Sequence, residues 1–232
     1  MKTLRRHKYA ILLAALVCVV FIQSFAHRRV LGSVASDLVV TTSMLLVFLI
    51  IFDRLVHRLV AFIAAVTAVA IDWAHYVMLP SPHQALLAVA YHGALLLLFG
   101  FATFLILRNV FEQRVVRTDD VLGAVCGYLL AAGAWSSLYV LIETFMPGSF
   151  TVAPGFEAGL DSWHGRTAVL NYVSLGALTS VGSGGVVPVL PPATVLTALE
   201  AVFGQFYIAV VVAQLVSTRL SHARQQSDSS QS

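Results

Sequence analysis

Long apolar segments alternate with short polar connections over most of the chain. A helix needs about 20 predominantly apolar residues to cross the hydrocarbon core of a bilayer. Six segments have a suitable length, at positions 9–26, 34–52, 59–79, 85–107, 121–142 and 194–217. The pattern therefore predicts an all-α membrane protein with six transmembrane helices.

The segment between the fifth and sixth predicted spans, residues 143–193, is too polar and too rich in glycine and proline to cross a bilayer. Residues 167–178 within it have the length of about three helical turns, which is too short for a crossing. The stretch "GSGG", Gly182 to Gly185, follows. Irregular backbone at membrane depth persists only where protein buries it or where it lines a water-filled path. We therefore expect a short helix and a glycine-rich loop that together line such a path.

The composition supports a membrane protein and argues against other classes. Hydrophobic residues occupy 59% of the 232 positions and charged residues only 11%, whereas soluble domains carry about 25% charged residues. The net charge is +3, but the basic residues form no patch, so we expect the lipid bilayer and no nucleic acid as a partner. Cys18 and Cys126 fall inside apolar runs, and we interpret them as small helix-packing residues rather than disulfide or metal ligands.

Lysine and arginine concentrate on one side of the six-helix arrangement, as they do in cytoplasmic loops. Eleven of the fourteen lie on that side, and only Arg28, Arg29 and Arg166 lie on the other. This distribution predicts a multi-pass protein of the cell inner (plasma) membrane with both termini cytoplasmic. Residues 1–26 also fit a cleaved signal peptide, because "QSFA" has small residues at the cleavage spacing. The length of the apolar run and the adjacent arginines favour a retained first helix.

The glycine-rich loop has a spacing that suits a column of backbone oxygens. Carbonyl groups face one line only if successive residues alternate in hand, and glycine adopts positive φ without strain. The stretch "SVGSG", Ser180 to Gly184, has glycine at every second position after Val181. One chain supplies only one wall of such a column, so a closed cage around an ion requires several copies.

The same stretch resembles the filter of the potassium-channel pore family, which reads T-T-V-G-Y-G-D and is followed by a proline. This chain reads "TSVGSGG", from Thr179 to Gly185, and then has Pro188. The preceding "NYVSLGALTS" is similar to the family's pore helix. The following "ATVLTALEAVFGQFYIAVVVAQL" is similar to its bacterial inner helix, with Gly204 at the place of the hinge glycine, which serves as a gate. The resemblance covers about residues 121–220.

This resemblance implies a homotetrameric passive channel for monovalent cations, with a re-entrant pore helix and filter loop between helices five and six. The ion-binding residues would be Thr179 to Gly184: Thr179, Ser180, Val181, Gly182, Ser183 and Gly184. Backbone oxygens and the Ser180 hydroxyl would replace the hydration shell of the ion. The resemblance implies potassium as the permeant ion, with a non-selective sodium/potassium pore as the alternative, and no cofactor or other metal.

The filter departs from the family at two positions that normally brace its outer half. Ser183 stands in place of the tyrosine and Gly185 in place of the aspartate. These changes predict a looser outer mouth and a weaker preference for potassium over sodium. Gly176 and Ala177, in the predicted pore helix, suggest that there is room for an aromatic ring at position 183.

Ionisable residues inside predicted spans are costly and invite functional interpretations. Asp72 and His75 share a face of the third predicted helix, and His92 lies at a similar depth on the fourth. A contact between them would act as helix glue or as a pH sensor, because histidine titrates near neutrality. Glu200, one turn before Gly204, would either support the filter from behind or face the cavity, and we favour support.

The fourth predicted helix contains no arginine or lysine, although voltage sensors need several charges that move through the field. We therefore predict a four-helix membrane domain without gating charges at residues 1–117, a pore domain at 118–220 and a disordered cytoplasmic tail at 221–232. A non-conducting regulatory channel subunit is the alternative from another class. An enzyme is not expected, since H-E-x-x-H and paired intramembrane aspartates are lacking in the sequence.

Overall fold

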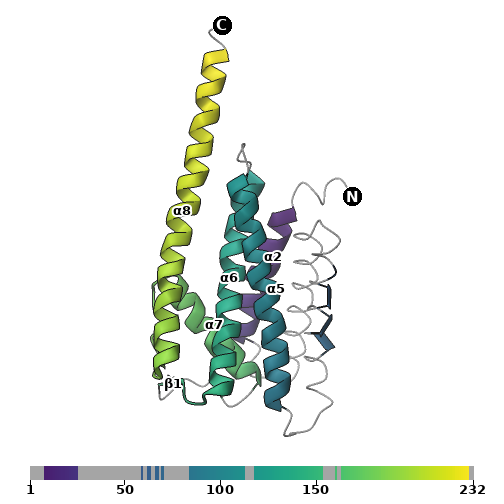
Figure 1. Ribbon diagram of the computed structural model, residues 1–232, viewed down its shortest axis with the longest axis vertical. Helices are drawn as coiled ribbons and strands as arrows, with labels where there is room; N and C mark the ends of the chain where they lie inside the picture. The colour runs from purple at the N-terminus through teal and green to yellow at the C-terminus, as the bar shows by residue number, and fades with distance from the viewer. Residues whose placement is uncertain are drawn as a thin grey trace.

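A computed structural model describes residues 8–25, 59, 62–63, 66–67, 69–70, 84–112, 118–153, 160 and 163–229. These parts are mostly helical, with a small two-stranded ribbon (Figure 1). The elements are the helices α2 (Lys8–Phe25), α5 (Gln84–Glu112), α6 (Thr118–Phe145), α7 (Trp163–Leu178) and α8 (Pro191–Ser229), and the strands β1 (Phe150–Val152) and β2 (Val186–Pro188).

Three helices are long and apolar enough to cross a membrane, namely Ala85–Glu112, Asp119–Phe145 and Pro191–Gln214. They coincide with the fourth, fifth and sixth predicted spans, so these three predictions are confirmed. The first predicted span is also helical as α2, whose apolar part Tyr9–Cys18 is shorter than a spanning helix. The predicted spans 34–52 and 59–79 lie largely outside the described residues.

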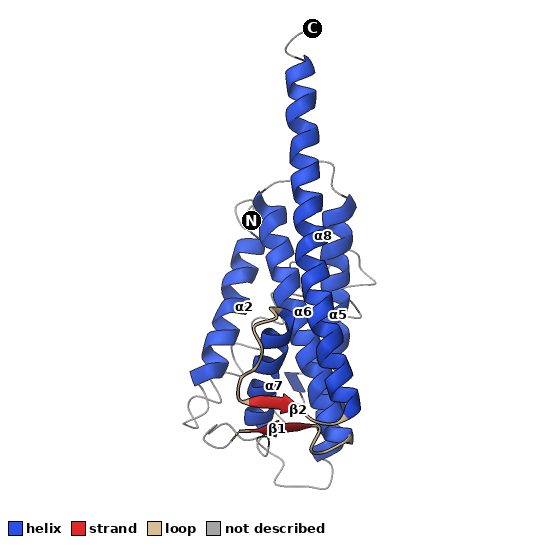
Figure 2. Ribbon diagram, turned by 90° about the vertical axis from the view of Figure 1, so that its left-hand side faces the viewer, coloured by secondary structure: helices blue, strands red, loops and turns tan. Residues whose placement is uncertain are grey.

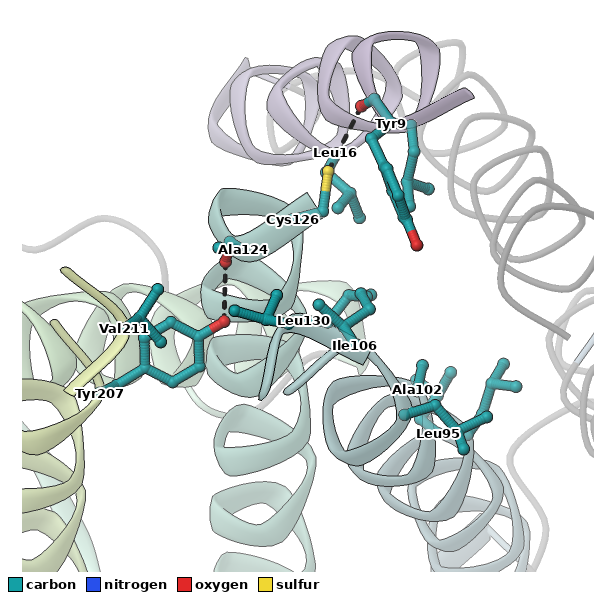
Figure 3. Close-up of a cluster of buried hydrophobic side chains, with 14 of the residues drawn as sticks. Tyr9, Leu16, Leu95, Ala102, Ile106, Ala124, Cys126, Leu130, Tyr207 and Val211 are labelled. Carbon is teal, nitrogen blue, oxygen red and sulfur yellow. Dashed lines mark hydrogen bonds between the residues drawn. The ribbon is translucent and has the colours of Figure 1, made fainter. Parts of the chain in front are cut away.

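Helix α6 occupies the centre of the described structure and contacts α2, α5, α7 and α8. Two hydrogen bonds link helices within the buried core between α2, α5, α6 and α8 (Figure 3). The Tyr207 hydroxyl donates to the Ala124 carbonyl oxygen at 2.7 Å, and the Cys126 thiol donates to the Tyr9 carbonyl oxygen at 3.4 Å. Cys126 is therefore a buried packing residue, as its sequence context predicts.

The ribbon brings together the two ends of the segment that contains the glycine-rich loop. Strands β1 and β2 pair antiparallel, with Phe150 opposite Pro188 and Val152 opposite Val186. The Ala153 N–H extends this pairing by donating to the Gly185 carbonyl oxygen at 2.7 Å. The chain therefore leaves the ribbon after β1, passes through α7 and returns along the loop to β2 at the same end of the molecule (Figure 2).

Helix α8 is longer than the predicted sixth span and extends beyond the other helices (Figure 1). It continues to Ser229, whereas the sequence predicts a disordered tail over residues 221–232. No glycine or proline occurs between Gly204 and Ser229. Several residues near this end, such as Leu220, Ala223 and Arg224, have favourable helix propensities, and neither glycine nor proline interrupts the helix.

Candidate functional site: a glycine-rich loop between α7 and α8

The loop Thr179–Gly185 has positive φ angles at every second residue. They are 58° at Ser180, 87° at Gly182 and 35° at Gly184. The two glycines adopt this region readily, as their spacing predicts. Ser180 carries a Cβ, and a non-glycine residue in this region costs about 1–3 kcal/mol, which the surrounding structure must offset. The alternation is therefore held in place by contacts with α7 and α8.

Backbone amides attach the loop to α7. The Thr179 N–H donates to the Leu175 carbonyl oxygen at 3.1 Å, and the Ser180 N–H donates to the Ala177 oxygen at 2.9 Å. The Gly182 N–H donates to the Gly176 oxygen at 3.0 Å. Within the described part of the chain, no backbone N–H is bonded to the carbonyl oxygens of Thr179, Ser180 or Val181. Three N–H groups of the loop are therefore bonded to α7, whereas three successive carbonyl oxygens accept no backbone N–H from the described residues.

Further along the loop, the carbonyl oxygens of Gly182 and Ser183 contact other parts of the chain. A Cβ placed on Gly176 would lie 2.7 Å from the Gly182 oxygen, so this carbonyl packs directly against the backbone of α7. The Ser183 oxygen accepts hydrogen bonds from the Gly185 N–H at close range and from the Val186 N–H at 2.9 Å. The Gly182 and Ser183 oxygens therefore differ from those of Thr179 to Val181, because the first packs against α7 and the second is hydrogen-bonded.

The space over Gly176 is also filled, contrary to what the sequence suggests about room for an aromatic ring. Backbone atoms of Gly182 and Ser183 lie 2.7–3.2 Å from the position that a Gly176 Cβ would take. Gly176 therefore serves the close approach of the loop to α7. A tyrosine ring at position 183 cannot use this space without moving the loop.

The three hydroxyl groups of the loop have different partners. The Thr179 hydroxyl donates to the Leu175 carbonyl oxygen at 2.6 Å, and the Ser183 hydroxyl donates to the Val186 oxygen at 2.7 Å. The Ser180 hydroxyl oxygen instead accepts from the side-chain amide of Gln205 on α8, at 2.9 Å. Two hydroxyls are therefore turned back to the backbone of their own neighbourhood, while Ser180 is linked to α8.

Glu200 is a fully buried junction of α6, α7 and α8. One carboxyl oxygen contacts the Tyr139 hydroxyl at close range, and the other lies 2.5 Å from the Ser174 hydroxyl. The Ser174 hydroxyl also lies 2.8 Å from the Ala132 carbonyl oxygen on α6. Side-chain exposure at Glu200 is 0%, so its position fits the support role and not a carboxylate facing a cavity.

Gly204 lies in uninterrupted helix, at the point where α8 meets the end of α7. A Cβ on Gly204 would lie 2.0 Å from the Leu178 carbonyl oxygen, which real structures do not tolerate. The same oxygen accepts a hydrogen bond from the Tyr128 hydroxyl at 2.7 Å. Gly204 therefore permits a close helix contact here, and its role as a hinge stays a prediction.

The candidate pH-sensing residues are only partly described. His92 is buried on α5 and makes an edge-to-face contact with Tyr91, at 4.9 Å between ring centroids. Asp72 and His75 lie outside the described residues, so their predicted proximity to His92 stays a prediction.

Four polar residues of the site have partners that were not predicted from the sequence. Tyr139 and Ser174 complete the Glu200 junction, and Gln205 holds Ser180. Glu143 is buried at the end of α6 and accepts from the N–H groups of Gly148 and Phe150, at 2.8 and 3.1 Å. Their common signal is a polar side chain in a largely apolar helix, which usually binds a neighbouring helix or backbone.

A comparison of the chain with known protein families, curated proteins and solved structures gives no match.

Proposed function

We propose that the chain is one subunit of a homotetrameric channel that conducts monovalent cations passively through the loop Thr179–Gly185. One observation carries this proposal. Alternating positive φ angles accompany three successive carbonyl oxygens, those of Thr179, Ser180 and Val181, that accept no backbone N–H in the described part of the chain. An array of unused acceptors is suited to replacing the water around a cation.

The membrane environment strengthens this argument. The helices before and after the α7–loop segment, α6 and α8, are both long and apolar enough to span a bilayer. Polar backbone without a partner is costly in an apolar environment, so irregular backbone there must be buried in protein or line a wet path. We infer that α7 and the loop re-enter the membrane from the end that carries the ribbon and line such a path.

The exposed surface of a single chain argues for several copies. The Val181 side chain is 85% exposed, although it sits in the middle of the loop. Helix α8 also exposes Val195, Leu199, Val202 and Phe206. A second copy beside the first would cover Val181, and four copies around one axis would close the ring of oxygens. The subunits would lie in the inner (plasma) membrane with both termini cytoplasmic.

The resemblance of "TSVGSGG" to the potassium-channel filter makes potassium the first candidate for the permeant ion. A specific observation favours the alternative of a non-selective sodium/potassium pore. The Gly182 oxygen packs against α7, and the Ser183 oxygen accepts two backbone N–H groups. Fewer oxygens per chain then remain for the ion, and selectivity depends on the number of coordinating oxygens. We expect potassium preference that is weaker than a longer column would give.

The test is a reversal potential for purified protein in a planar bilayer, with potassium on one side and sodium on the other. Cation current with a potential between zero and the full potassium potential supports the proposal. Gly182→Ala is the matched control, because an added side chain is strained at a φ of 87°; this variant should lose the current. Protein that inserts, forms tetramers and carries no cation flux would favour the regulatory-subunit alternative.

A further inference from the structure

The sequence pattern assigns no role to Gln205. It follows Gly204 on α8, and its Nε2 atom donates to the Ser180 Oγ atom at 2.9 Å. Both side chains are exposed at the surface of the single chain. The contact joins α8 to the loop at the residue whose φ of 58° is the least favourable for its side chain. Gln205 therefore fixes the position of Ser180 from the side of α8.

Gly204 sets the geometry of this contact. Its missing side chain allows α8 to approach the Leu178 carbonyl oxygen, where a Cβ would lie only 2.0 Å away. The end of α7 and the beginning of the loop are thereby brought beside α8. The next residue along α8, Gln205, then reaches Ser180, two residues after Leu178.

The direction of the hydrogen bond leaves two oxygen ligands available in the same place. A hydroxyl group has one hydrogen and two acceptor lone pairs. Because Ser180 Oγ accepts from Gln205, one lone pair is used and another remains. The amide donates through its nitrogen, so its Oε1 atom keeps its acceptor capacity. By contrast, Thr179 and Ser183 direct their hydroxyl hydrogens to backbone carbonyls.

We propose that Ser180 Oγ and Gln205 Oε1 of each subunit together form a cation site at the inner end of the loop, and that Gln205 determines its specificity. This inference rests on the proposed channel function and deepens it. Both ligands are neutral oxygens, which suit an alkali cation and bring no fixed charge. Without a carboxylate, the site attracts divalent cations less strongly than a charged site of the same shape would.

Gln205→Glu tests this specificity with little change in shape. The carboxylate has no N–H, so the hydrogen bond reverses and Ser180 becomes the donor. Four subunits would then place four negative charges beside the bound ion. Barium is a divalent cation close to potassium in size, and its block of the current from the cytoplasmic side should become at least about tenfold tighter, because opposite charges at close range attract strongly.

Gln214→Glu is the matched control, with the same substitution nine residues further along α8. Nine residues make about two and a half helical turns, so position 214 lies on the opposite face of the helix. This variant should leave barium block within about twofold of the wild type, since screening weakens charges at such distances. Gln205→Asn provides a second, neutral variant whose shorter side chain no longer reaches Ser180.

The experiment compares barium block and the sodium/potassium reversal potential for the wild type and the three variants in bilayers. We expect tighter block for Gln205→Glu alone and an altered potassium-to-sodium permeability ratio, about threefold or more, for Gln205→Asn. Wild-type current with equal barium block in Gln205→Glu and Gln214→Glu, and an unchanged ratio in Gln205→Asn, overturns the inference and leaves the channel intact. A wild type without cation current overturns the proposed function itself.

Discussion

The two sides of the glycine-rich loop differ in whether their polar groups have hydrogen-bond partners. Behind the loop, Glu200 is buried and hydrogen-bonded to the hydroxyl groups of the buried Tyr139 and Ser174. In front, Ser180 and Val181 are exposed, and their carbonyl oxygens accept no backbone N–H from the described residues. Polar groups buried in a protein need partners, since each lost partner costs stability. The back side therefore holds the loop through hydrogen bonds within the chain, whereas the front side presents the unbonded oxygens on which the proposed function rests.

The largest effect is expected from removing the buried junction. Glu200→Ala deletes the carboxyl group that joins Tyr139 to Ser174, and it leaves a cavity between α6, α7 and α8. We expect a loss of about 2–3 kcal/mol in the free energy of unfolding, from two lost hydrogen bonds and lost packing. Thermal unfolding in detergent measures this loss, and channel current should disappear together with it.

Leu199→Ala is the control for this prediction, because the neighbouring Leu199 side chain is 52% exposed and outside the junction. Glu200→Gln should retain most of the stability. The single Ser174 hydrogen has two oxygens within reach, the Ala132 carbonyl and the Glu200 carboxyl. A glutamine amide supplies a second hydrogen and still accepts from Tyr139. If alanine and glutamine at position 200 were equally destabilising, hydrogen bonding would not explain the role of the junction.

A smaller effect is expected at Gly204, where α8 contacts the end of α7. Gly204→Ala places a methyl group 2.0 Å from the Leu178 oxygen, so α8 must move away from α7. Overpacking of this kind costs about 1–3 kcal/mol. The shift should also separate Gln205 from Ser180 and change the potassium-to-sodium permeability ratio. Thermal unfolding and the reversal potential measure the two effects.

Gly100→Ala on α5 is the matched control for Gly204→Ala, since nothing lies within 4 Å of its added Cβ. Alanine has the higher helix propensity, so this variant should be equal or slightly higher in stability. Comparison of the two variants shows whether Gly204 acts through its close contact with α7 or as a hinge. A hinge without contact would change the open probability and leave the unfolding temperature unaltered.

The sequence predicted the helices better than it predicted the contacts of the loop. Apolar length alone identifies α5, α6 and α8, because a bilayer imposes the same requirement on every spanning helix. Glycine spacing predicted positive φ at Gly182 and Gly184, since only backbone geometry is involved. The partners of Glu200 and Ser180 lie 26, 61 and 25 residues away along the chain. Such contacts depend on how helices pack, which local pattern does not specify.

Gly176 and the end of α8 are two further places where the local sequence does not predict the structure. The sequence suggests open space beside Gly176, but the returning backbone of Gly182 fills it. Whether a missing side chain leaves room or admits a neighbour depends on the tertiary structure. The tail after residue 220 appears polar and disordered in sequence, yet α8 continues to Ser229. A polar composition does not end a helix when neither glycine nor proline interrupts it.

The smallest effect is expected at the outer end of the loop, where Ser183 makes a local contact. Its hydroxyl donates to the Val186 oxygen at 2.7 Å, three residues further along the chain. Ser183→Ala removes this bond and nothing else within the junction or the Gln205 contact. A partly exposed hydrogen bond contributes about 0.5–1.5 kcal/mol, so the unfolding temperature should fall only slightly. The Ser183 carbonyl would keep both of its backbone donors, and the ribbon would keep its register.

Because the carbonyls of Thr179 to Val181 stay unchanged, the potassium-to-sodium permeability ratio should equal that of the wild type. Reversal potentials for Ser183→Ala and Ser180→Ala, measured side by side, test this difference between the two ends. A larger change of the ratio in Ser183→Ala than in Ser180→Ala would place the selective oxygens at the outer end of the loop and would contradict the division drawn from their hydrogen bonds.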